Sequence, residues 1–133
     1  MSLEKAVRSV LIDDATVAAL VSARVYPQRR PMGTSVPALI YQNVHGATNQ
    51  ALATQGGIQR TRLAIECIDS TYGGTKTLQS AVEGALINYT GTLEGETINS
   101  LRLESAVEID ETNEPGGEFG FFRIILDFVI WHQ

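Results

Sequence analysis

The clearest pattern of apolar and polar positions lies near the end of the chain, from Phe119 to Trp131. Successive side chains of a strand point to opposite faces, so a strand here has one wholly apolar face: Phe122, Ile124, Leu126, Phe128 and Ile130. The other face mixes apolar and charged residues: Phe121, Arg123, Ile125, Asp127, Val129 and Trp131. At roughly 13 residues the stretch is about twice the usual strand length. We predict a central strand, with the apolar face in the core and the mixed face left for solvent or another chain.

Two further stretches alternate in the same way. Residues 59–69 place Thr61, Leu63, Ile65 and Cys67 inward, and Arg60, Arg62, Ala64 and Glu66 outward. Residues 100–110 place Leu101, Leu103, Val107 and Ile109 on one face, and Arg102, Glu104, Glu108 and Asp110 on the other. Residues 38–44 predict a strand that pairs with 59–69 in a hairpin, whose tip is the polar, glycine-bearing loop 45–58. A brief extended segment at residues 24–26 ends at Pro27.

Helical spacing of apolar residues occurs in three places. Residues 2–12 carry Leu3, Val7, Val10 and Leu11 on one stripe, and a second short helix, with Val17, Leu20 and Val21, begins at Asp13 or Asp14. The principal helix follows the N-cap candidates Asp69, Ser70 and Thr71. Its stripe is Leu78, Ala81, Val82, Ala85, Leu86 and Tyr89. Gly73 and Gly74 weaken its first turn, so the helix could begin as late as Thr75. We interpret residues 90–98 as a turn-rich link.

This order of elements predicts an α+β fold. The sheet is expected to be mainly antiparallel, with about four to five strands and with helices packed on one face. We see no linker that would divide residues 1–133, and therefore expect a single domain. A chain of 133 residues is long enough to bury a real core.

Composition excludes several classes of protein. An apolar fraction of 44% and a charged fraction of 19% are typical of a globular protein and not of a disordered one. No run approaches the ~20 apolar residues that span a bilayer, so we expect a cytosolic chain without a signal peptide or membrane contact. The single cysteine, Cys67, excludes an internal disulfide and a zinc site with several cysteines.

Charge is distributed unevenly along the chain. Residues 1–82 carry eight Arg and Lys and five Asp and Glu, a balance of +3, whereas residues 83–133 carry two and ten, a balance of −8. A globally acidic chain argues against a dedicated nucleic-acid binder. Opposite signs on separate segments could instead let the basic side of one copy meet the acidic side of another. Eight of the ten basic residues are Arg, the cation favoured at protein interfaces.

No constellation of catalytic or metal-binding residues emerges. The histidines are His45, beside a glycine, and His132, next to the end of the sequence. Cys67 lies in the inward set of its strand, where a free cysteine is commonly buried and inert. The acidic residues from Glu104 to Glu114 lack the spacing of a calcium loop, and the glycine pairs lack the form of a phosphate-binding loop. We therefore expect no catalytic residue, no cofactor and no metal, and interpret the chain as an interaction protein.

The order of motifs resembles a known family. The first part has a helix, a D-x-x-V-x-x-L helix, R-V-Y-P, a proline-bounded loop and P-x-L-x-Y-Q, within SLEKAVRSVLIDDATVAALVSARVYPQRRPMGTSVPALIYQ. The arginine-containing strand and helix follow in RTRLAIECIDSTYGGTKTLQSAV, and the end reads D-F-x-I-W in FRIILDFVIWHQ. In this layout the chain is similar to the tail-completion or tail-terminator proteins of long-tailed phages and prophages. The resemblance covers nearly the whole chain.

The resemblance implies a structural virion protein at the junction of tail and head, made in the cytoplasm of the bacterial host. Such a protein caps the tail tube as a ring, generally a hexamer, and offers a surface on which the head docks. Its partners are then further copies of itself, the tail tube protein and a head-completion or connector protein. DNA passes through the ring without specific binding.

The charges and loops suggest where contacts with other chains lie. We expect them at the basic loop 27–37, the hairpin tip 45–58, the acidic loop 111–118 and the charged strand faces. The candidate contact residues are Arg29, Arg30, Arg60, Arg62, Glu111, Glu114, Glu118, Arg123 and Asp127. Two other functions stay open. One is a head-side connector, or neck protein, and the other is a module that binds a small ligand or nucleic acid.

Overall fold

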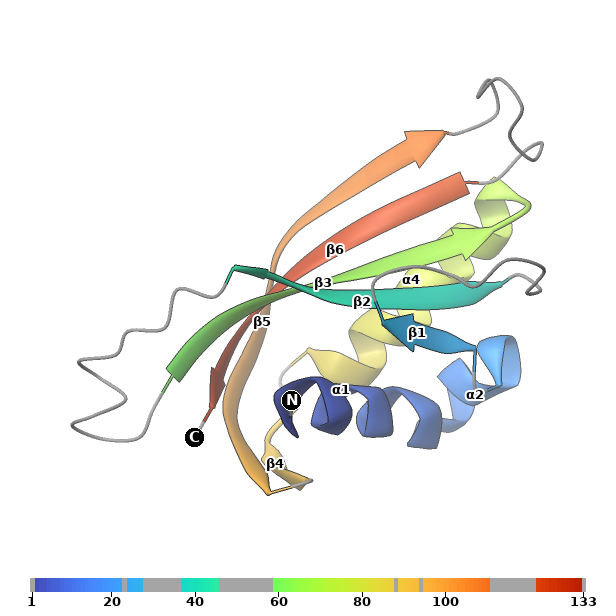
Figure 1. Cartoon of the computed structure of the whole chain (residues 1–133). Helices are drawn as coiled ribbons and strands as arrows, with labels where there is room; N and C mark the ends of the chain where they lie inside the picture. Colours follow the sequence, from blue (N-terminus) through green and yellow to red (C-terminus); the bar gives the residue numbers. More distant parts are fainter. Residues whose placement is uncertain are drawn as a thin grey trace.

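The computed structural model describes residues 2–22, 24–27, 37–45, 59–87, 89–93, 95–110 and 122–132. Three helices and six strands lie in this part of the chain (Figure 1). In chain order they are α1 (Ser2–Asp13), α2 (Ala15–Val21), β1 (Val25–Pro27), β2 (Ala38–His45), β3 (Gln59–Asp69), α4 (Tyr72–Leu86), β4 (Gly91–Leu93), β5 (Glu96–Asp110) and β6 (Phe122–His132).

The strands form one sheet in the order β1-β2-β3-β6-β5-β4. β1 runs parallel to β2, and every other neighbouring pair is antiparallel. The α+β class is therefore confirmed, but the expectation of four to five strands in a mainly antiparallel sheet is wrong, because the sheet has six strands and is mixed. The missed strand is β4, which lies inside the stretch interpreted as a link. It turns back through Gly95, whose φ of +79° suits a glycine, and pairs with the start of β5.

β6 lies in the interior of the sheet, between β3 and β5, as predicted for a central strand. Its apolar face is also confirmed, because Ile124, Leu126, Phe128 and Ile130 are each at most 1% exposed. Arg123 and Asp127 lie on the opposite face and are half-buried. β6 begins at Phe122, and Phe119 to Phe121 lie outside the described residues.

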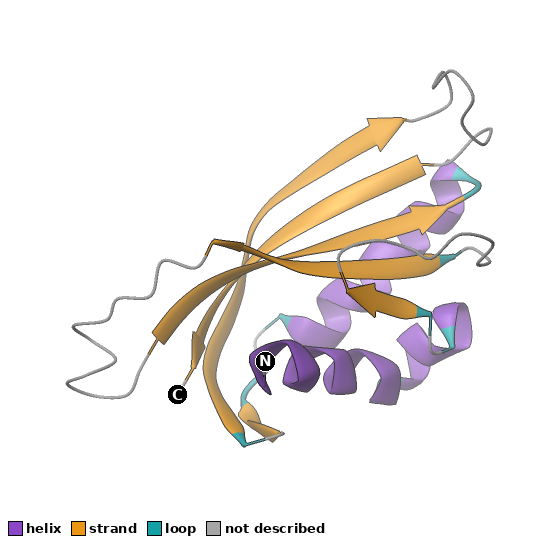
Figure 2. Cartoon of the chain, in the orientation of Figure 1, coloured by secondary structure: helices purple, strands orange, loops and turns teal. Residues whose placement is uncertain are grey.

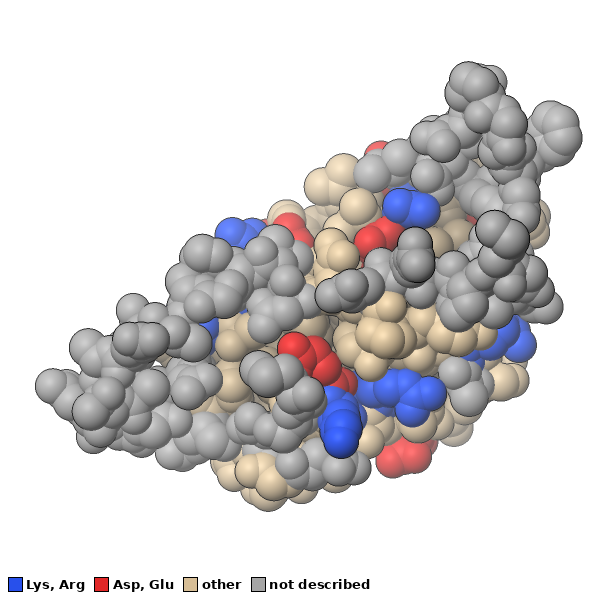
Figure 3. Space-filling view, viewed as in Figure 1, with Lys and Arg blue, Asp and Glu red and all other residues tan. Residues whose placement is uncertain are grey.

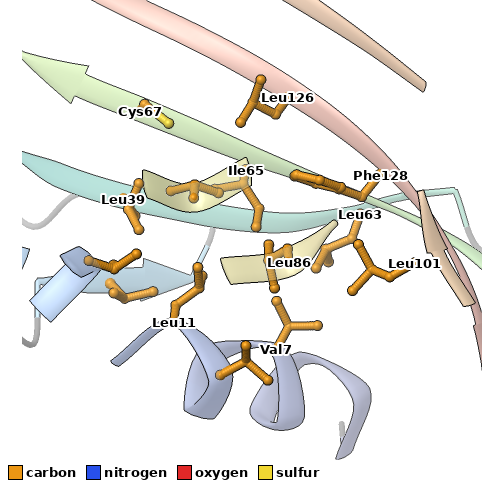
Figure 4. Close-up of a cluster of buried hydrophobic side chains, with 14 of the residues drawn as sticks. Val7, Leu11, Leu39, Leu63, Ile65, Cys67, Leu86, Leu101, Leu126 and Phe128 are labelled. Atoms are coloured by element: carbon orange, nitrogen blue, oxygen red, sulfur yellow. The ribbon is translucent and has the colours of Figure 1, made fainter. Parts of the chain in front are cut away.

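The helices lie on one side of the curled sheet (Figure 2). α1 and α4 both contact the sheet and each other, and α2 packs against both. Figure 4 shows the core that results: Val7 and Leu11 of α1 and Leu86 of α4 approach side chains from the inner faces of four strands. Those strand residues are Leu39, Leu63, Ile65, Cys67, Leu101, Leu126 and Phe128. Two short amphipathic helices that would be marginal alone are stabilised by this packing.

Local sequence signals place the helix starts. The Asp14 carboxylate accepts hydrogen bonds from the backbone N–H groups of Thr16 and Val17 at 3.0 Å each, which caps α2. Thr71 caps α4 by accepting from the N–H of Gly74 at 3.0 Å. The helix does not slip to Thr75 but begins at Tyr72, with Gly74 in its first turn. A side chain at Gly74 would clash with the carboxylate of Asp69, so the glycine allows this close approach.

The predicted faces are confirmed for β3 but not for the whole of β5. Leu101 of β5 is buried and Leu103 packs against the core, as expected. The pairing of β5 with β6 then shifts between Leu103 and Ser105, where a β-bulge inserts an extra residue. The alternation reverses after the bulge, so Val107 is 50% exposed on the outer face and Glu108 turns to the helix side. The predicted alternation is therefore wrong at Val107 and Glu108, while the side chains of Ile109 and Asp110 lie outside what the structure describes.

The central position of β6 leads to a test of the fold. Phe128→Ala should lower the free energy of unfolding by about 3–5 kcal/mol, because it removes a fully buried aromatic ring and leaves a cavity. Asp127→Ala, the neighbouring residue on the opposite face, should cost much less, because its side chain is partly hydrated. Urea denaturation of both variants measures the difference. Equal losses would contradict the assignment of the two faces.

Candidate assembly surface on the outer face of the sheet

Four of the predicted contact residues lie together on the sheet face that points away from the helices. Arg60 and Arg62 come from β3, and Arg123 and Asp127 come from β6. The register pairs Arg62 with Val129 and Ile68 with Arg123, which brings the outward set of β3 beside the outward set of β6. Arg29, Arg30, Glu111, Glu114 and Glu118 lie outside the described residues, as do the loops that contain them.

Two ion pairs cross diagonally between β3 and β6 on this outer face. A guanidinium nitrogen of Arg62 lies 3.6 Å from Asp127 Oδ2, and a guanidinium nitrogen of Arg123 lies 3.1 Å from Glu66 Oε1. The Ser105 hydroxyl donates to Asp127 Oδ2 at 3.1 Å, so Asp127 links three strands. Glu66 completes the set, although it was predicted only as an outward residue. Three of the predicted contact residues, Arg62, Arg123 and Asp127, are therefore already in ion pairs within this chain.

The outer face is apolar as well as charged. Ile40, Ala64, Ile68 and Val129 are each at most 4% exposed there, yet they do not belong to the core beneath the helices. The guanidinium of Arg60 lies over the ring of Trp131, with Cζ 5.9 Å from the ring centroid. These apolar positions are therefore already covered within the chain, and the half-buried residues of this face, Arg60, Arg62, Arg123, Asp127 and Trp131, are the ones that can contact another protein.

The positive and negative charges are not separated into two faces in the view of Figure 3, where Lys and Arg lie beside Asp and Glu. The imbalance between the two halves of the sequence therefore does not appear as one basic and one acidic region in this view. The physical reason is the fold: β3, from the basic half, lies beside β6, from the acidic half.

A second polar cluster, missed in the sequence, joins α4 to β5. Lys76 Nζ donates to Glu108 Oε2 at 2.9 Å, and the Tyr72 hydroxyl lies 3.1 and 3.2 Å from the two carboxylate oxygens. The Tyr72 ring meets Phe122 edge-to-face, with 6.0 Å between ring centroids. The hydrogen bond to Glu108 raises the pKa of Lys76, and the hydrogen bonds from Lys76 and Tyr72 lower the pKa of Glu108. Residue spacing does not reveal the bulge in β5. Simple alternation along the strand therefore predicts that Glu108 faces solvent on the outer side, and the cluster with Lys76 is missed.

The remaining reactive groups are buried. Burial raises the pKa of the Cys67 thiol, which holds it in the neutral, unreactive form. His132 is buried as well, and its Nε2 lies 2.8 Å from the Thr61 hydroxyl. In the described ranges, His, Cys, Asp and Glu side chains form no group of three that could hold a metal ion. No helix among the described residues is long and apolar enough to span a membrane.

Comparison with known families decides the kind of protein. A family model described as tail completion protein gp17 matches residues 5–133. The chain belongs to this family. The predicted resemblance to phage tail-completion proteins is thereby confirmed, and the chain is a structural protein of phage-type tails. A comparison with curated protein sequences finds no significant match.

A solved structure supports the fold. A chain in the structure titled "Virion of native gene transfer agent (GTA) particle" aligns with a TM-score of 0.78 and 23% sequence identity. The alignment covers 98% of this chain and 93% of that one. At this identity the similarity shows that the two chains share a fold.

The contact between Lys76 and Glu108 makes stability depend on pH. The pKa of Glu108 is lower in the folded chain than in the unfolded chain. The ionised carboxylate therefore contributes to the free energy of unfolding above the ordinary pKa of glutamate, and this contribution is lost as the pH falls through the lowered value. The Lys76 pKa is raised, so its contribution is lost only as the pH rises through that raised value. Glu108→Gln should therefore melt below wild type at neutral pH, and the gap should close below about pH 4.

Melting temperatures recorded from pH 3 to pH 9 measure this gap. Glu104→Gln is the matched control, because Glu104 lies on the same strand and is also exposed, but its contact with Arg102 is longer, at 3.9 Å against 2.9 Å for Lys76 and Glu108. This control should follow wild type. A constant gap between Glu108→Gln and wild type at every pH would contradict a role for the charge of Glu108.

Proposed function

We propose that the chain caps the tail tube and joins it to the head as a hexameric ring. The observation that carries this proposal is the match to the tail-completion family over residues 5–133. A small chain whose described part has no metal cluster, but has a broad mixed sheet face, suits a structural role. The partners are then the tail tube protein, a head-completion or connector protein and further copies of this chain.

The outer face supplies contact residues for this assembly. Arg60, Arg62, Arg123 and Asp127 lie within one two-strand patch and are neither fully exposed nor sealed in the core. A neighbouring chain can approach this patch while the two internal ion pairs remain in place, so assembly leaves no charge unpaired. The loops with Arg29, Arg30, Glu111, Glu114 and Glu118 add contacts to the same assembly.

In a closed ring, one rotation relates each copy to the next, so every copy contacts its two neighbours through two different patches. The charged outer face is one such patch. The ring lies at the junction of tail and head in the virion, and DNA passes through it without specific binding. The net charge of −5 favours passage over adhesion, because like charges repel.

Mass and tube binding test the proposed function together. At high protein concentration, light scattering should report a mass near six times the chain mass of 14.4 kDa. Mixed with purified tail tubes, the protein should appear at one end of each tube in negative-stain images and should stop further growth of the tube. A strict monomer that binds neither tubes nor its own copies would exclude a terminator. Binding to the portal side alone would favour a head-side connector.

The outer face can be tested with two matched substitutions. Arg62→Gln should weaken assembly about tenfold while the melting temperature stays close to that of wild type. Lys76→Gln is the control, because Lys76 is also in an ion pair and the side chains of Arg62 and Lys76 are 38% and 43% exposed. Lys76 lies on the helix side, so its loss should leave assembly unchanged. Sedimentation velocity across a concentration series measures both, and equal effects would remove the outer face from the interface.

A further inference from the structure

Three arginines gather at one end of the outer face, around Trp131. The register pairs Trp131 with Arg60 of β3, and it pairs Val129 with Arg62 of β3 on one side and with Arg102 of β5 on the other. The two rows are neighbours on one face, because residues two apart in a strand point the same way. We call the group of Arg60, Arg62, Arg102 and Trp131 the arginine corner.

The positive charge of the arginine corner is only partly neutralised within the chain. Its two ion pairs are long, at 3.6 Å from Arg62 to Asp127 and 3.9 Å from Arg102 to Glu104, against the about 2.7–2.9 Å of a charge-assisted hydrogen bond. Arg62 Nε is buried and has no acceptor among the described residues, and Arg60 forms no ion pair with any of them. Three positive charges therefore face two loosely placed negative charges.

Arg102 lies where another chain can reach it. Its side chain is 68% exposed. β4 pairs only with residues 96–98, so no strand among the described residues covers the outer edge of β5 beside Arg102. A second protein can therefore approach the arginine corner without displacing a neighbouring strand.

The chemistry of the arginine corner favours a carboxylate over a nucleic acid. A guanidinium presents its N–H groups in one plane, and they match the two oxygens of a carboxylate. Arg60 lies over the Trp131 ring, which places a cation where a base would stack. The net charge of −5 also opposes the approach of a polyanion. An acidic protein surface therefore fits the site better.

A carboxylate of the required kind lies at the junction of α1 and α2. Asp13 is the last residue of α1 and is exposed. The C-terminal end of the helix macrodipole is negative and opposes a second negative charge, and the last turn of α1 holds no basic residue. The next carboxylate, that of Asp14, caps α2. The charge of Asp13 therefore does not stabilise its own helix.

The arginines that flank this junction along the chain have other partners. Arg8 donates to the backbone oxygen of Val25 at 3.2 Å. Arg24 donates to two backbone oxygens at 2.9 and 3.3 Å. Among the described residues, Asp13 therefore has no basic partner within its own chain.

We propose that the arginine corner of one copy binds Asp13 of a second copy. Figure 1 places the end of β6, beside the C-terminal marker, at the left of the molecule, and the junction of α1 and α2 at the right. Two different patches on opposite sides make a heterologous contact, which can close a ring when it repeats from copy to copy. The inference rests on the ring of the proposed function and identifies the second of its two patches.

Charge reversal tests this contact. Arg102→Glu and Asp13→Arg each place like charges opposite one another, so each should weaken assembly by about tenfold or more. Combining both substitutions in one chain restores an opposite pair, and this double variant should assemble about tenfold more tightly than either single variant. Sedimentation velocity across a concentration series measures all three. A double variant that assembles no better than the single variants would overturn the contact.

Asp13→Asn separates a role in assembly from a role in folding. Removing a negative charge from the end of α1 should leave the melting temperature equal to or slightly above that of wild type, while assembly weakens about tenfold. Glu83→Gln is the control, because it removes a carboxylate from the last turn of α4 and should leave assembly unchanged. Equal losses of assembly in both variants, or none in Asp13→Asn, would count against the contact.

The fluorescence of Trp131 identifies what covers the arginine corner. Trp131 is the only tryptophan of the chain, so its emission reports from this site. The emission should shift to shorter wavelength as wild type assembles, and Asp13→Asn should need about tenfold more protein for the same shift. A shift on addition of duplex DNA or purified tail tubes, without a shift on self-assembly, would overturn the proposal and assign the site to that partner.

These outcomes distinguish failure of this inference from failure of the proposed function. A ring of the expected mass that forms equally well with Asp13→Arg would overturn this contact alone. A chain that stays monomeric at every concentration and does not bind tail tubes would overturn both.

Discussion

The structure depends on one constraint: β6 must bury its apolar face while β3 and β5 pair with both of its edges. Phe128 and Leu126 are fully buried, and residues of both neighbouring strands lie opposite them. A strand with no free edge cannot shift its register without losing two sets of hydrogen bonds and exposing its core face. The helices then have one surface to cover, and the mixed face lies on the other side of the sheet.

The bulge in β5 changes what that strand does along its length. Before the bulge, Leu101 packs in the core. After it, Glu108 reaches Lys76 at the start of α4, and Val107 points to the outer side. One extra residue thus divides the strand into a part that holds the fold together and a part that is exposed with an open edge. Bulges commonly re-aim side chains in this way at functional positions.

Membership of the tail-completion family gives these features a common explanation. A protein that works in an assembly needs surfaces that tolerate water before assembly and contact with protein afterwards. The charges of Asp127 and Glu66 are already paired in the single chain, so the proposed contact with another protein does not require either to lose its partner. The exposed charges of β5 also discourage unwanted pairing of its open edge in the free chain.

The sequence by itself determined which residues form helices and the longer strands, because helix caps, such as Asp14 and Thr71, and apolar periodicity act over a few residues. It also determined the core face of β6 and the motifs that place the chain in its family. The tertiary structure alone decided three things. It placed Arg62 beside Asp127, it turned Glu108 towards Lys76 through the bulge, and it gave the three-residue strands β1 and β4 places at the sheet edges. Each of these depends on pairing between segments distant in the chain, and no local pattern records which partner a strand will find or where its register shifts.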